Sequence, residues 1–486
     1  MKNHILSDID GNNLINDADN LLKELFPICR SITGNGVRQT LSILKKVADF
    51  NIKEIPSGTK CYDWTVPNEW NIVDAYVEDS SGRKIIDFKK NNLHLVSYSE
   101  PVDKTLSYQE LIKHLHTLPD LPDAIPYRTS YYNKNWGFCL SHNDFQKLDE
   151  TEQYHVKIDS TLEPGNLTYG DFFIKGNSGK EFLFSTYCCH PSLGNDNLSG
   201  MVLWILLLRS LQKEIPTHSY RFIIVPETIG AIAYLSQNET EMKKITGGFI
   251  LTCVAGPNNF EYKRSYLGNN LIDKAVDDSF NDLGLSYTKY PFDINGSDET
   301  HFSAPYFRIP IGTVCKDKYY EFDYYHTSLD NLDFINAKNL IKSLKVNFSI
   351  INHLEDLNMV DMDNISRKLT HNNESKNDVF YRSLNPYCEP MLSKRGLHPT
   401  IGGKIKQKAF NFKTNHIQRN YTAFDEVHNH TGSEIDAIGW LMFYGDGITS
   451  VKEISKKSKL ELSLLENIAE KLVGHKLLEK IEASNI

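Results

Sequence analysis

The chain of 486 residues is too long for a single core, and its 40% hydrophobic and 24% charged residues are ordinary for a folded protein. Its 53 basic and 62 acidic residues give a net charge of −9, which excludes a molecule-wide basic surface for nucleic acid or anionic membrane. Eight cysteines without any CxxC pair argue against a disulfide scaffold and against a zinc ribbon.

The N-terminal part predicts helices and then a β-rich unit. MKNHILSDIDGNNLIN has no apolar run of the secretory kind, and the longest apolar run, residues 201–208, is too short for a bilayer, so we expect a cytoplasmic protein without a membrane partner. Helical spacing of apolar residues over 17–47, around SITGNG, predicts a helix, a loop and a second helix. Short β-rich runs over 62–140 predict a small inserted unit.

From residue 181 onward, apolar strands alternate regularly with helices. Strands that are apolar on both faces and separated by helices indicate a mainly parallel sheet covered on both sides, that is, an α/β fold. The strands are predicted in EFLFSTYC, RFIIVPE, GGFILTCV and PIGTVC, and the helices in NLSGMVLWILLLRSL, IGAIAYLSQ, NNLIDKAVDDSFNDL and residues 336–354.

A polar linker, MDNISRKLTHNNESKNDV, separates this sheet from a third unit. A helix near 438–443, then VKEISKKS, LSLLENIAEKLVG and the strand-like LLEKIEA, predict a winged helix-turn-helix. Its presumed recognition helix is acidic, which argues against DNA as a partner and favours domain packing or a homodimer. The expected units are an α/β domain (1–60 and 141–360), an insert (61–140) and a winged-helix domain (375–486).

His190 and Asp196 lie in CCHPSLGNDNLSG, which directly follows a predicted strand and precedes a predicted helix. In an open parallel sheet, ligands bind at this carboxyl edge of the strands. An imidazole and a carboxylate on one tight loop form a ligand pair for a divalent ion, zinc in particular. A histidine at a strand end is often only hydrogen-bonded, but DNLSG beginning at Asp196 favours the metal site.

Glu227 ends the next predicted strand, in VPETIG, at the same edge of the sheet. A carboxylate beside a metal ion can act as the general base, taking a proton from the attacking water and passing it to the leaving nitrogen. The alternative is a carboxylate that a helix N-terminus favours through the helix dipole. The residues alone leave both interpretations open.

Two later motifs supply further candidates. YYHTSLDN offers His326 as a metal ligand and Asp330 as a carboxylate that orients a bound imidazole. GSDETHF offers Asp298 and Glu299 in the same supporting role. Tyr325 is of a type that most often packs in a core or at a rim, and its hydroxyl is also a candidate donor to a developing oxyanion.

The order of these motifs resembles the co-catalytic zinc aminopeptidases, a family that also includes glutaminyl cyclases. NDNLSG, GSDETHF and YHTSLDN carry the resemblance, which covers about residues 165–360. The wider layout resembles bacterial aminopeptidase-like proteins of polysaccharide-biosynthesis gene clusters, which have a protease-associated-like insert and a C-terminal winged helix. FPICRSITGNGVRQTL and NPYCEPMLSKRGL fit that narrower group and extend the resemblance over nearly the whole chain.

The resemblance implies that His190 binds a first zinc, Asp196 bridges, His326 binds a second zinc and Glu227 is the general base. The family usually has a second glutamate where this chain has Thr228, and an aspartate ligand where it has Cys253. Cys253 is then either a substitute zinc ligand or a buried thiol. The centre accordingly holds one zinc ion or two, and Glu227 is either base or ligand.

Two functional hypotheses follow. The first is a zinc-dependent hydrolase of amide bonds, acting on a peptide or on an N-acyl or aminoacyl group of a small molecule such as an amino sugar. The second is a regulatory or non-catalytic protein that retains the hydrolase fold and acts through metal or ligand binding and its winged helix.

Overall fold

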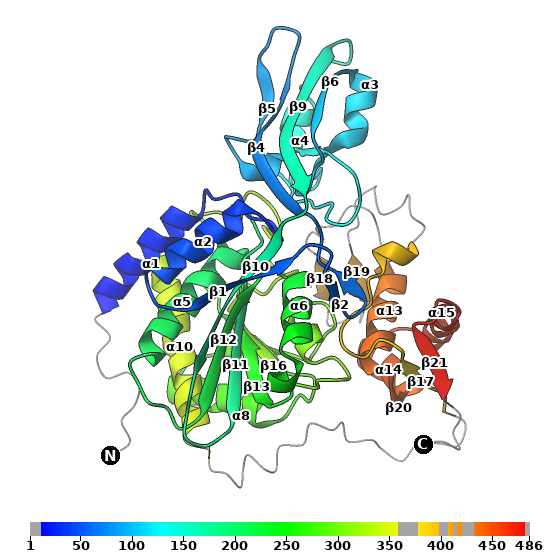
Figure 1. The fold of residues 1–486 in the computed structure, drawn as a ribbon. Coiled ribbons are helices and arrows are strands. Elements are labelled where there is room, and N and C mark those ends of the chain that lie inside the picture. Colours follow the sequence, from blue (N-terminus) through cyan, green and yellow to red (C-terminus); the bar gives the residue numbers. More distant parts are fainter. Residues whose placement is uncertain (1–10, 358–377, 398–406, 412–415, 420–431, 482–486) are drawn as a thin grey trace.

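The structure, a computed structural model, describes residues 11–357, 378–397, 407–411, 416–419 and 432–481. A central α/β body carries a small sheet on one side and a C-terminal unit on another (Figure 1). The predicted polar linker lies almost entirely outside the described residues. Within the described residues, no helix has the length and apolar character needed to span a membrane.

The central sheet has eight strands, in the order β1-β10-β12-β11-β13-β16-β14-β15. The pairs β12–β11, β11–β13 and β13–β16 are parallel. The pairs β1–β10, β10–β12 and β14–β16 are antiparallel. The sheet is therefore mixed: its centre is parallel, and antiparallel pairs join β10 to one side of this centre and β14 to the other. The strands are β1 Asn51–Pro56, β10 Asn166–Ile174, β11 Glu181–Tyr187, β12 Ser219–Val225, β13 Ile245–Ile250, β14 Phe260–Lys263, β15 Tyr287–Tyr290 and β16 Ile311–Lys316.

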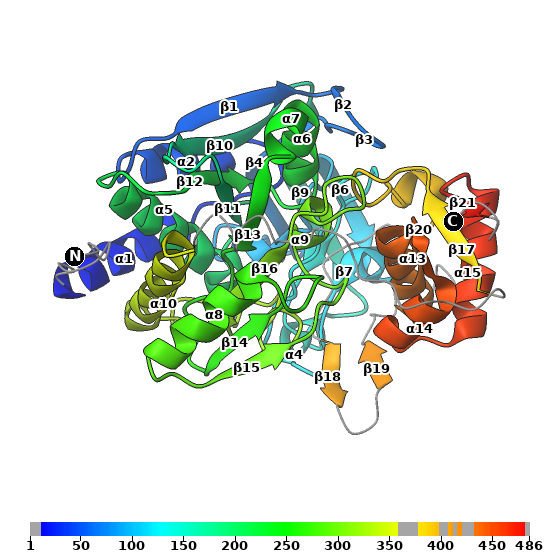
Figure 2. The same cartoon turned by 90° about the horizontal axis from the view of Figure 1, so that it is seen from below.

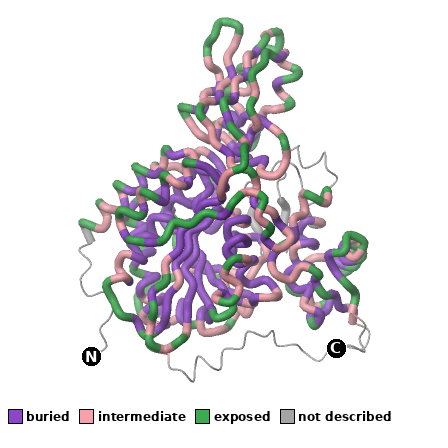
Figure 3. Tube along the Cα trace, in the orientation of Figure 1, coloured by how far each residue is buried: buried purple, intermediate pink, exposed green. Residues whose placement is uncertain are grey.

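Helices cover both faces of this sheet, as the alternation along β11 requires. Phe182 and Phe184 pack into one core and Leu183 into the other, because successive side chains of a strand point to opposite faces. The inner strands of the central sheet are buried along most of their length (Figure 3). The first face carries α1 Gly11–Leu25, α2 Asn35–Lys45, α5 Gly200–Leu211, α8 Leu271–Asp282 and α10 Ala337–Glu355; residues of α6 Ile229–Gln237, α7 Glu239–Met242 and α9 Glu299–Phe302 belong to the second core.

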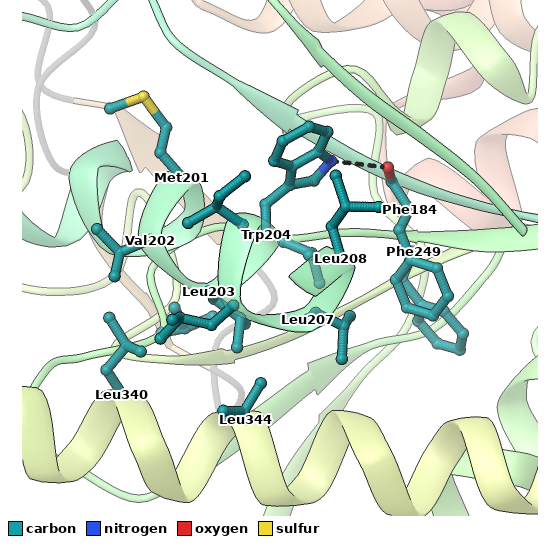
Figure 4. Packing of buried hydrophobic residues seen from close by; sticks show 14 of the residues in the cluster. Phe184, Met201, Val202, Leu203, Trp204, Leu207, Leu208, Phe249, Leu340 and Leu344 are labelled. Atoms are coloured by element: carbon teal, nitrogen blue, oxygen red, sulfur yellow. Dashed lines mark hydrogen bonds between the residues drawn. The ribbon is translucent and has the colours of Figure 1, made fainter. Parts of the chain in front are cut away.

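Helix α5 is apolar almost all round and buried between the sheet and α10. Leu203 and Leu207 point towards α10, from which Leu340 and Leu344 meet them (Figure 4). On the sheet side, the Trp204 indole N–H donates to the carbonyl of Phe184 over 3.3 Å. Full burial of each such side chain contributes about 1.5–3 kcal/mol, so this helix holds the loop that precedes it firmly at the sheet edge.

A second, four-stranded antiparallel sheet has the order β5-β4-β9-β6. Its strands run from residue 69 to residue 163, so the small sheet continues past residue 140, where the sequence placed the end of the insert. The strands are β4 Glu69–Glu78, β5 Lys84–Asp87, β6 Val102–Ser107 and β9 Gln153–Glu163; shorter elements nearby are β2 Lys60–Cys61, β3 Trp64–Thr65, η1 Asn92–His94, α3 Tyr108–Leu111, η2 Ile112–His114, β7 Leu115–His116, β8 Phe138–Cys139 and α4 His142–Phe145.

The C-terminal unit has a three-stranded antiparallel sheet, β20-β17-β21, packed with helices. The predicted helices and the last strand are confirmed, while membership of the winged-helix class stays a prediction. The elements are β17 Phe380–Ser383, η4 Ser393–Arg395, β18 Gln407–Asn411, β19 His416–Arg419, α13 Gly432–Tyr444, β20 Asp446–Ser450, α14 Val451–Ser458, α15 Leu462–Gly474 and β21 Leu478–Ile481.

Candidate metal centre

The segment that carries His190 and Asp196 leaves the end of β11 and enters α5 through the short helical segment η3, Gly194–Ser199. It lies at the carboxyl edge of the parallel strands, where open α/β sheets bind ligands. The buried Arg30 guanidinium donates through Nε to the carbonyl of His190 over 3.1 Å. The carboxylate of Asp330 accepts the backbone N–H groups of Asn195 and Asp196 over 2.6 and 2.9 Å. These contacts fix the loop on both sides.

His326 follows β16 in a separate loop, and the inserted region holds it in place. The Tyr127 backbone N–H donates to the carbonyl of His326 over 2.8 Å, and Pro126 pairs with Thr327 in an isolated β-bridge. The ring of Tyr325 stacks on the imidazole of His326, with ring centroids 3.9 Å apart and an interplanar angle of 15°. The Tyr127 ring lies about equally close to both imidazoles, 5.1 Å from His190 and 5.2 Å from His326.

The side chains of His190, Asp196 and His326 converge. One ligand atom from each lies within 4.8 Å of the other two, and all three residues are buried. His326 Nε2 and Asp196 Oδ2 are 3.0 Å apart, yet neither atom has a hydrogen-bond partner among the described residues. The two atoms stand at ion-pair distance, and a divalent cation between them would satisfy both buried groups. Two imidazoles and a carboxylate fit a divalent ion such as zinc.

The protonation states also fit metal binding. Burial lowers the pKa of His190 to about 4, so its imidazole is neutral near pH 7 and keeps a lone pair for a metal. Burial opposes ionisation of Asp196, but His190, His326 and a hydrogen bond from Tyr187 together hold its pKa below the usual value. The site therefore offers the neutral imidazole of His190 beside the ionised carboxylate of Asp196.

Glu227 follows β12 and reaches the same place. Its Oε2 atom is 3.7 Å from His190 Nε2, and its other oxygen accepts the Ser297 hydroxyl over 2.7 Å. Cys189, His190 and Glu227 form a second group whose ligand atoms lie within 4.8 Å of one another. Burial, and then the negative charges of Asp298 and Asp196, raise the pKa of Glu227 well above its usual value. A carboxyl with a raised pKa beside a metal site is suited to proton transfer.

Asp298 and Glu299 support Glu227 from behind. Asp298 accepts the backbone N–H of Thr228 over 2.7 Å, which holds the turn after Glu227, where Thr228 has φ +63°. Glu299 accepts the Ser297 N–H over 2.9 Å and is paired with Lys263 over 2.7 Å. Both carboxylates thus position the residues around Glu227, and neither belongs to the groups of possible metal ligands among the described residues.

Cys253 stands apart from the groups of possible metal ligands in the described part of the chain. Its side chain belongs to a buried cluster with Cys315, Tyr319, Phe322 and Tyr325. Burial raises the pKa of its thiol well above the usual value, which disfavours the thiolate that zinc would require. The geometry favours the buried-thiol interpretation of Cys253 over the ligand interpretation.

A pocket of about 380 Å³ opens onto this site. His190, Glu227 and His326 lie in its wall, beside Tyr127 and Tyr325. Much of the rest of the wall comes from the inserted region (127–133), the segment 294–305, the segment 388–393 and helix α13. The volume is at the small end of the range for ligand pockets, about 300–1,000 Å³.

Sequence reasoning missed several residues of the site. Ser297 lies inside the GSDETHF motif that the sequence singled out, but only the two acids of that motif were given a role. Tyr127 is far from every motif in the sequence and joins the site only through the fold. Tyr187 had a usable signal, since it ends the strand directly before CCH and faces Asp196.

Comparison with known proteins agrees with the fold. A family model described as "Domain of unknown function (DUF4910)" matches residues 19–357. A protein of Clostridium acetobutylicum, provisionally named a polysaccharide biosynthesis protein with an aminopeptidase-like domain, is 43% identical over 462 residues, covering 95% of this chain and 96% of its own.

Solved structures give the same picture. A crystal structure described as a peptidase, also provisionally named, from Clostridium acetobutylicum aligns with TM-score 0.69 and 41% identity over 96% of this chain and 97% of its own. A zinc aminopeptidase from Bacillus subtilis aligns with TM-score 0.52 and 13% identity over 71% of this chain and 94% of its own. A peptidase M28 precursor from Shewanella amazonensis aligns with TM-score 0.50 and 12% identity, over 70% and 94%. The last two similarities show a shared fold.

Proposed function

We propose that this protein is a zinc-dependent hydrolase of amide bonds. The premise is that the chain belongs to the family described as "Domain of unknown function (DUF4910)". The observation that carries the proposal is the convergence of His190, Asp196 and His326, with buried ligand atoms that lack hydrogen-bond partners among the described residues. The aminopeptidase-like fold of its relatives supports the reaction class.

One zinc ion held by His190, Asp196 and His326 fits the side chains present. Three protein ligands with an open position are typical of catalytic zinc, whereas structural zinc sites are closed by four. A second ion lacks support, because Thr228 and Cys253 stand where the resembled family has acidic ligands. When bound, the zinc would act as a Lewis acid on the carbonyl of the scissile amide.

Glu227 is the general base of the proposed reaction. Its Oε2 atom takes a proton from the attacking water and passes it to the leaving nitrogen. The Ser297 hydroxyl, bound to Oε1, holds the carboxylate in this orientation. Tyr325 supports the site by stacking on His326, and its ring also lies in the pocket wall, where its hydroxyl is a candidate donor to the developing oxyanion.

The substrate is a small amide: a short peptide, or an N-acyl or aminoacyl group on a small molecule. The pocket volume of about 380 Å³ supports a compact substrate. The name of the Clostridium acetobutylicum relative supports a substrate from polysaccharide synthesis, such as an acylated amino sugar.

The test compares parent protein with Glu227→Gln and with Glu24→Gln, a matched change on an exposed residue of α1. The parent and the control should contain one zinc per chain and hydrolyse aminoacyl-anilides. Glu227→Gln should keep the zinc and lose at least about 100-fold in kcat, since general bases contribute about 10²–10⁴-fold. Loss of zinc from Glu227→Gln would make Glu227 a ligand, and a parent with neither zinc nor hydrolysis would favour the non-catalytic hypothesis.

A further inference from the structure

The pocket wall combines two kinds of side chain. Some are polar and belong to the candidate metal centre: His190, Glu227 and His326. Others are apolar and come from the C-terminal unit, outside the part of the chain that the family model matches. The apolar residues that line the pocket from this unit and from the loop before α9 are Ile294, Leu392, Ile435, Ile438, Met442 and Phe443, and the buried Asp436 lies among them on α13.

Helix α13 is docked firmly in this position. It is the C-terminal helix nearest to the central body (Figures 1 and 2). Phe292 and Ile294, from the loop before α9, pack against its core, and the rings of Phe292 and Phe443 lie 4.7 Å apart. Arg308 binds Asp446 over 3.1 Å and lies 5.1 Å from the Phe443 ring centre. The helix is therefore a fixed wall of the pocket.

The segment 388–393 is fixed as well. The Trp64 indole N–H donates to the carbonyl of Glu389 over 2.8 Å. Asp63 accepts the Met391 N–H over 2.8 Å and pairs with Arg395 over 2.6 Å. Contacts between residues so far apart in the sequence mean that the pocket is complete only when the C-terminal unit is in place.

Exposure locates the mouth of the pocket, because Glu389 is an exposed member of the wall. Ile435, Ile438, Met442 and Phe443 are all less than 9% exposed, as are His190 and His326. The buried wall therefore includes both the candidate metal centre and these α13 residues, which form the inner end. Their apolar side chains would stabilise an apolar group of the ligand.

We propose that the C-terminal unit determines substrate specificity: α13 and Leu392 seat a compact apolar acyl group, and the leaving group extends towards Glu389. This proposal rests on the proposed hydrolase function for its reaction, but not for its binding site. Each methylene that fills such a site contributes about fourfold in affinity or kcat/KM, so a leucyl substrate should exceed a glycyl one by more than tenfold.

Two substitutions in α13 change the size of the inner end in opposite directions. A Cβ at Gly439 would lie 2.8 Å from Ile294 Cδ1, so Gly439→Ala narrows the space between the helix and the loop. Met442→Ala widens it. Ile448, on β20 of the same unit, is 44% exposed and outside the pocket wall, so Ile448→Ala is the matched control.

The kinetic test measures kcat/KM for glycyl-, alanyl-, leucyl-, phenylalanyl-, lysyl- and glutamyl-p-nitroanilides. The parent and Ile448→Ala should prefer leucyl and phenylalanyl substrates by more than tenfold. Gly439→Ala should reduce kcat/KM most for the phenylalanyl substrate. Met442→Ala should reduce kcat/KM more for the leucyl substrate than for the phenylalanyl substrate. A parent that prefers glycyl or charged substrates, or variants that leave the ratios unchanged, would overturn the proposal.

A binding test separates this proposal from the hydrolase proposal. Calorimetry on zinc-loaded Glu227→Gln protein would compare leucinamide with glycinamide, with and without Gly439→Ala and Met442→Ala. A preference for leucinamide that depends on both α13 positions would support the proposal that α13 determines specificity, even if no anilide is hydrolysed. Equal binding of the two amides, no binding, or a preference that survives both substitutions would refute it. Thermal unfolding of each variant shows whether it is folded.

Discussion

Two buried polar clusters lie close together in this protein and are satisfied in different ways. In the first, Glu299 accepts hydrogen bonds from Lys263 over 2.7 Å, Tyr319 over 2.5 Å and the Ser297 N–H over 2.9 Å. In the second, Asp196 Oδ2 and both ring nitrogens of His326 are buried without hydrogen-bond partners in the described residues.

The contrast separates a structural cluster from a functional one. Buried polar groups in native proteins are almost always hydrogen-bonded, and an exception needs its own explanation. The Glu299 cluster is complete within the protein, so it serves stability and positioning. In the proposed site a bound cation would complete the Asp196–His326 cluster, which is the function we propose for it.

The largest expected effect comes from the incomplete cluster. Asp196→Asn keeps the shape of the side chain but removes the charge that a cation needs, so zinc affinity should fall by more than the roughly 10–100-fold typical of residues that only support ligands. Zinc content after dialysis measures the loss of zinc affinity, and urea unfolding of the metal-free protein measures its stability. A variant that retains zinc, or that loses most of its stability, would contradict the contrast.

The complete cluster should give the opposite result. Lys263→Met leaves the Glu299 carboxylate buried without its cation, which should cost about 3–5 kcal/mol in the free energy of unfolding. Zinc content should stay at the parent level, because none of the three ligands contacts Lys263. Urea midpoints measure the loss of stability, and metal analysis measures the zinc content. A variant that stays stable but lacks zinc would show that the Glu299 cluster serves zinc binding and not stability.

The adjacent carboxyl groups of Asp298 and Glu299 should affect the pH dependence of stability in opposite ways. Burial raises the pKa of Asp298 from 3.8 to about 8, whereas Lys263 and Tyr319 outweigh burial and lower that of Glu299. An acid with a raised folded pKa holds more protons folded than unfolded, so its contribution to stability is lost as pH rises from 3.8 to about 8. Over this pH range, the free energy of unfolding of metal-free Asp298→Asn should therefore fall less than that of the parent, by on the order of 1–2 kcal/mol. Urea unfolding at several pH values measures this difference. Parallel curves for the two proteins would contradict the prediction.

Ser297 bridges Glu227 and Glu299, and its substitution should have the smallest effect. Ser297→Ala removes the hydroxyl that binds Glu227 but keeps the backbone N–H that binds Glu299. Losing one hydrogen bond to a charged group costs about 1.5 kcal/mol, so kcat should fall about tenfold. Zinc content and unfolding midpoint should stay at parent values, and an unchanged kcat would show that Glu227 needs no such support.

Much of the central body could be predicted from sequence. The strand at EFLFSTYC and the helix at NLSGMVLWILLLRSL were located because unbroken apolar runs leave few alternatives. Strands β14 and β15, at one end of the sheet, were missed, because they are short and carry no apolar run. The antiparallel β10 was also missed, and with it the mixed character of the sheet.

The site was predictable where motifs end strands and unpredictable where contacts are long-range. His190, Asp196, Glu227 and His326 were chosen for their places at the sheet edge, and the structure brings them together. The inner wall from α13 could not be foreseen, since nothing in the sequence of a helix tells which distant pocket it closes.

Zinc-edge anomalous scattering from crystals of the metal-loaded protein tests the central claim most directly. The account predicts one peak per chain, at bonding distance from a ring nitrogen of His190, a carboxylate oxygen of Asp196 and a ring nitrogen of His326. A peak held by other side chains, or no peak in protein saturated with zinc, would contradict it.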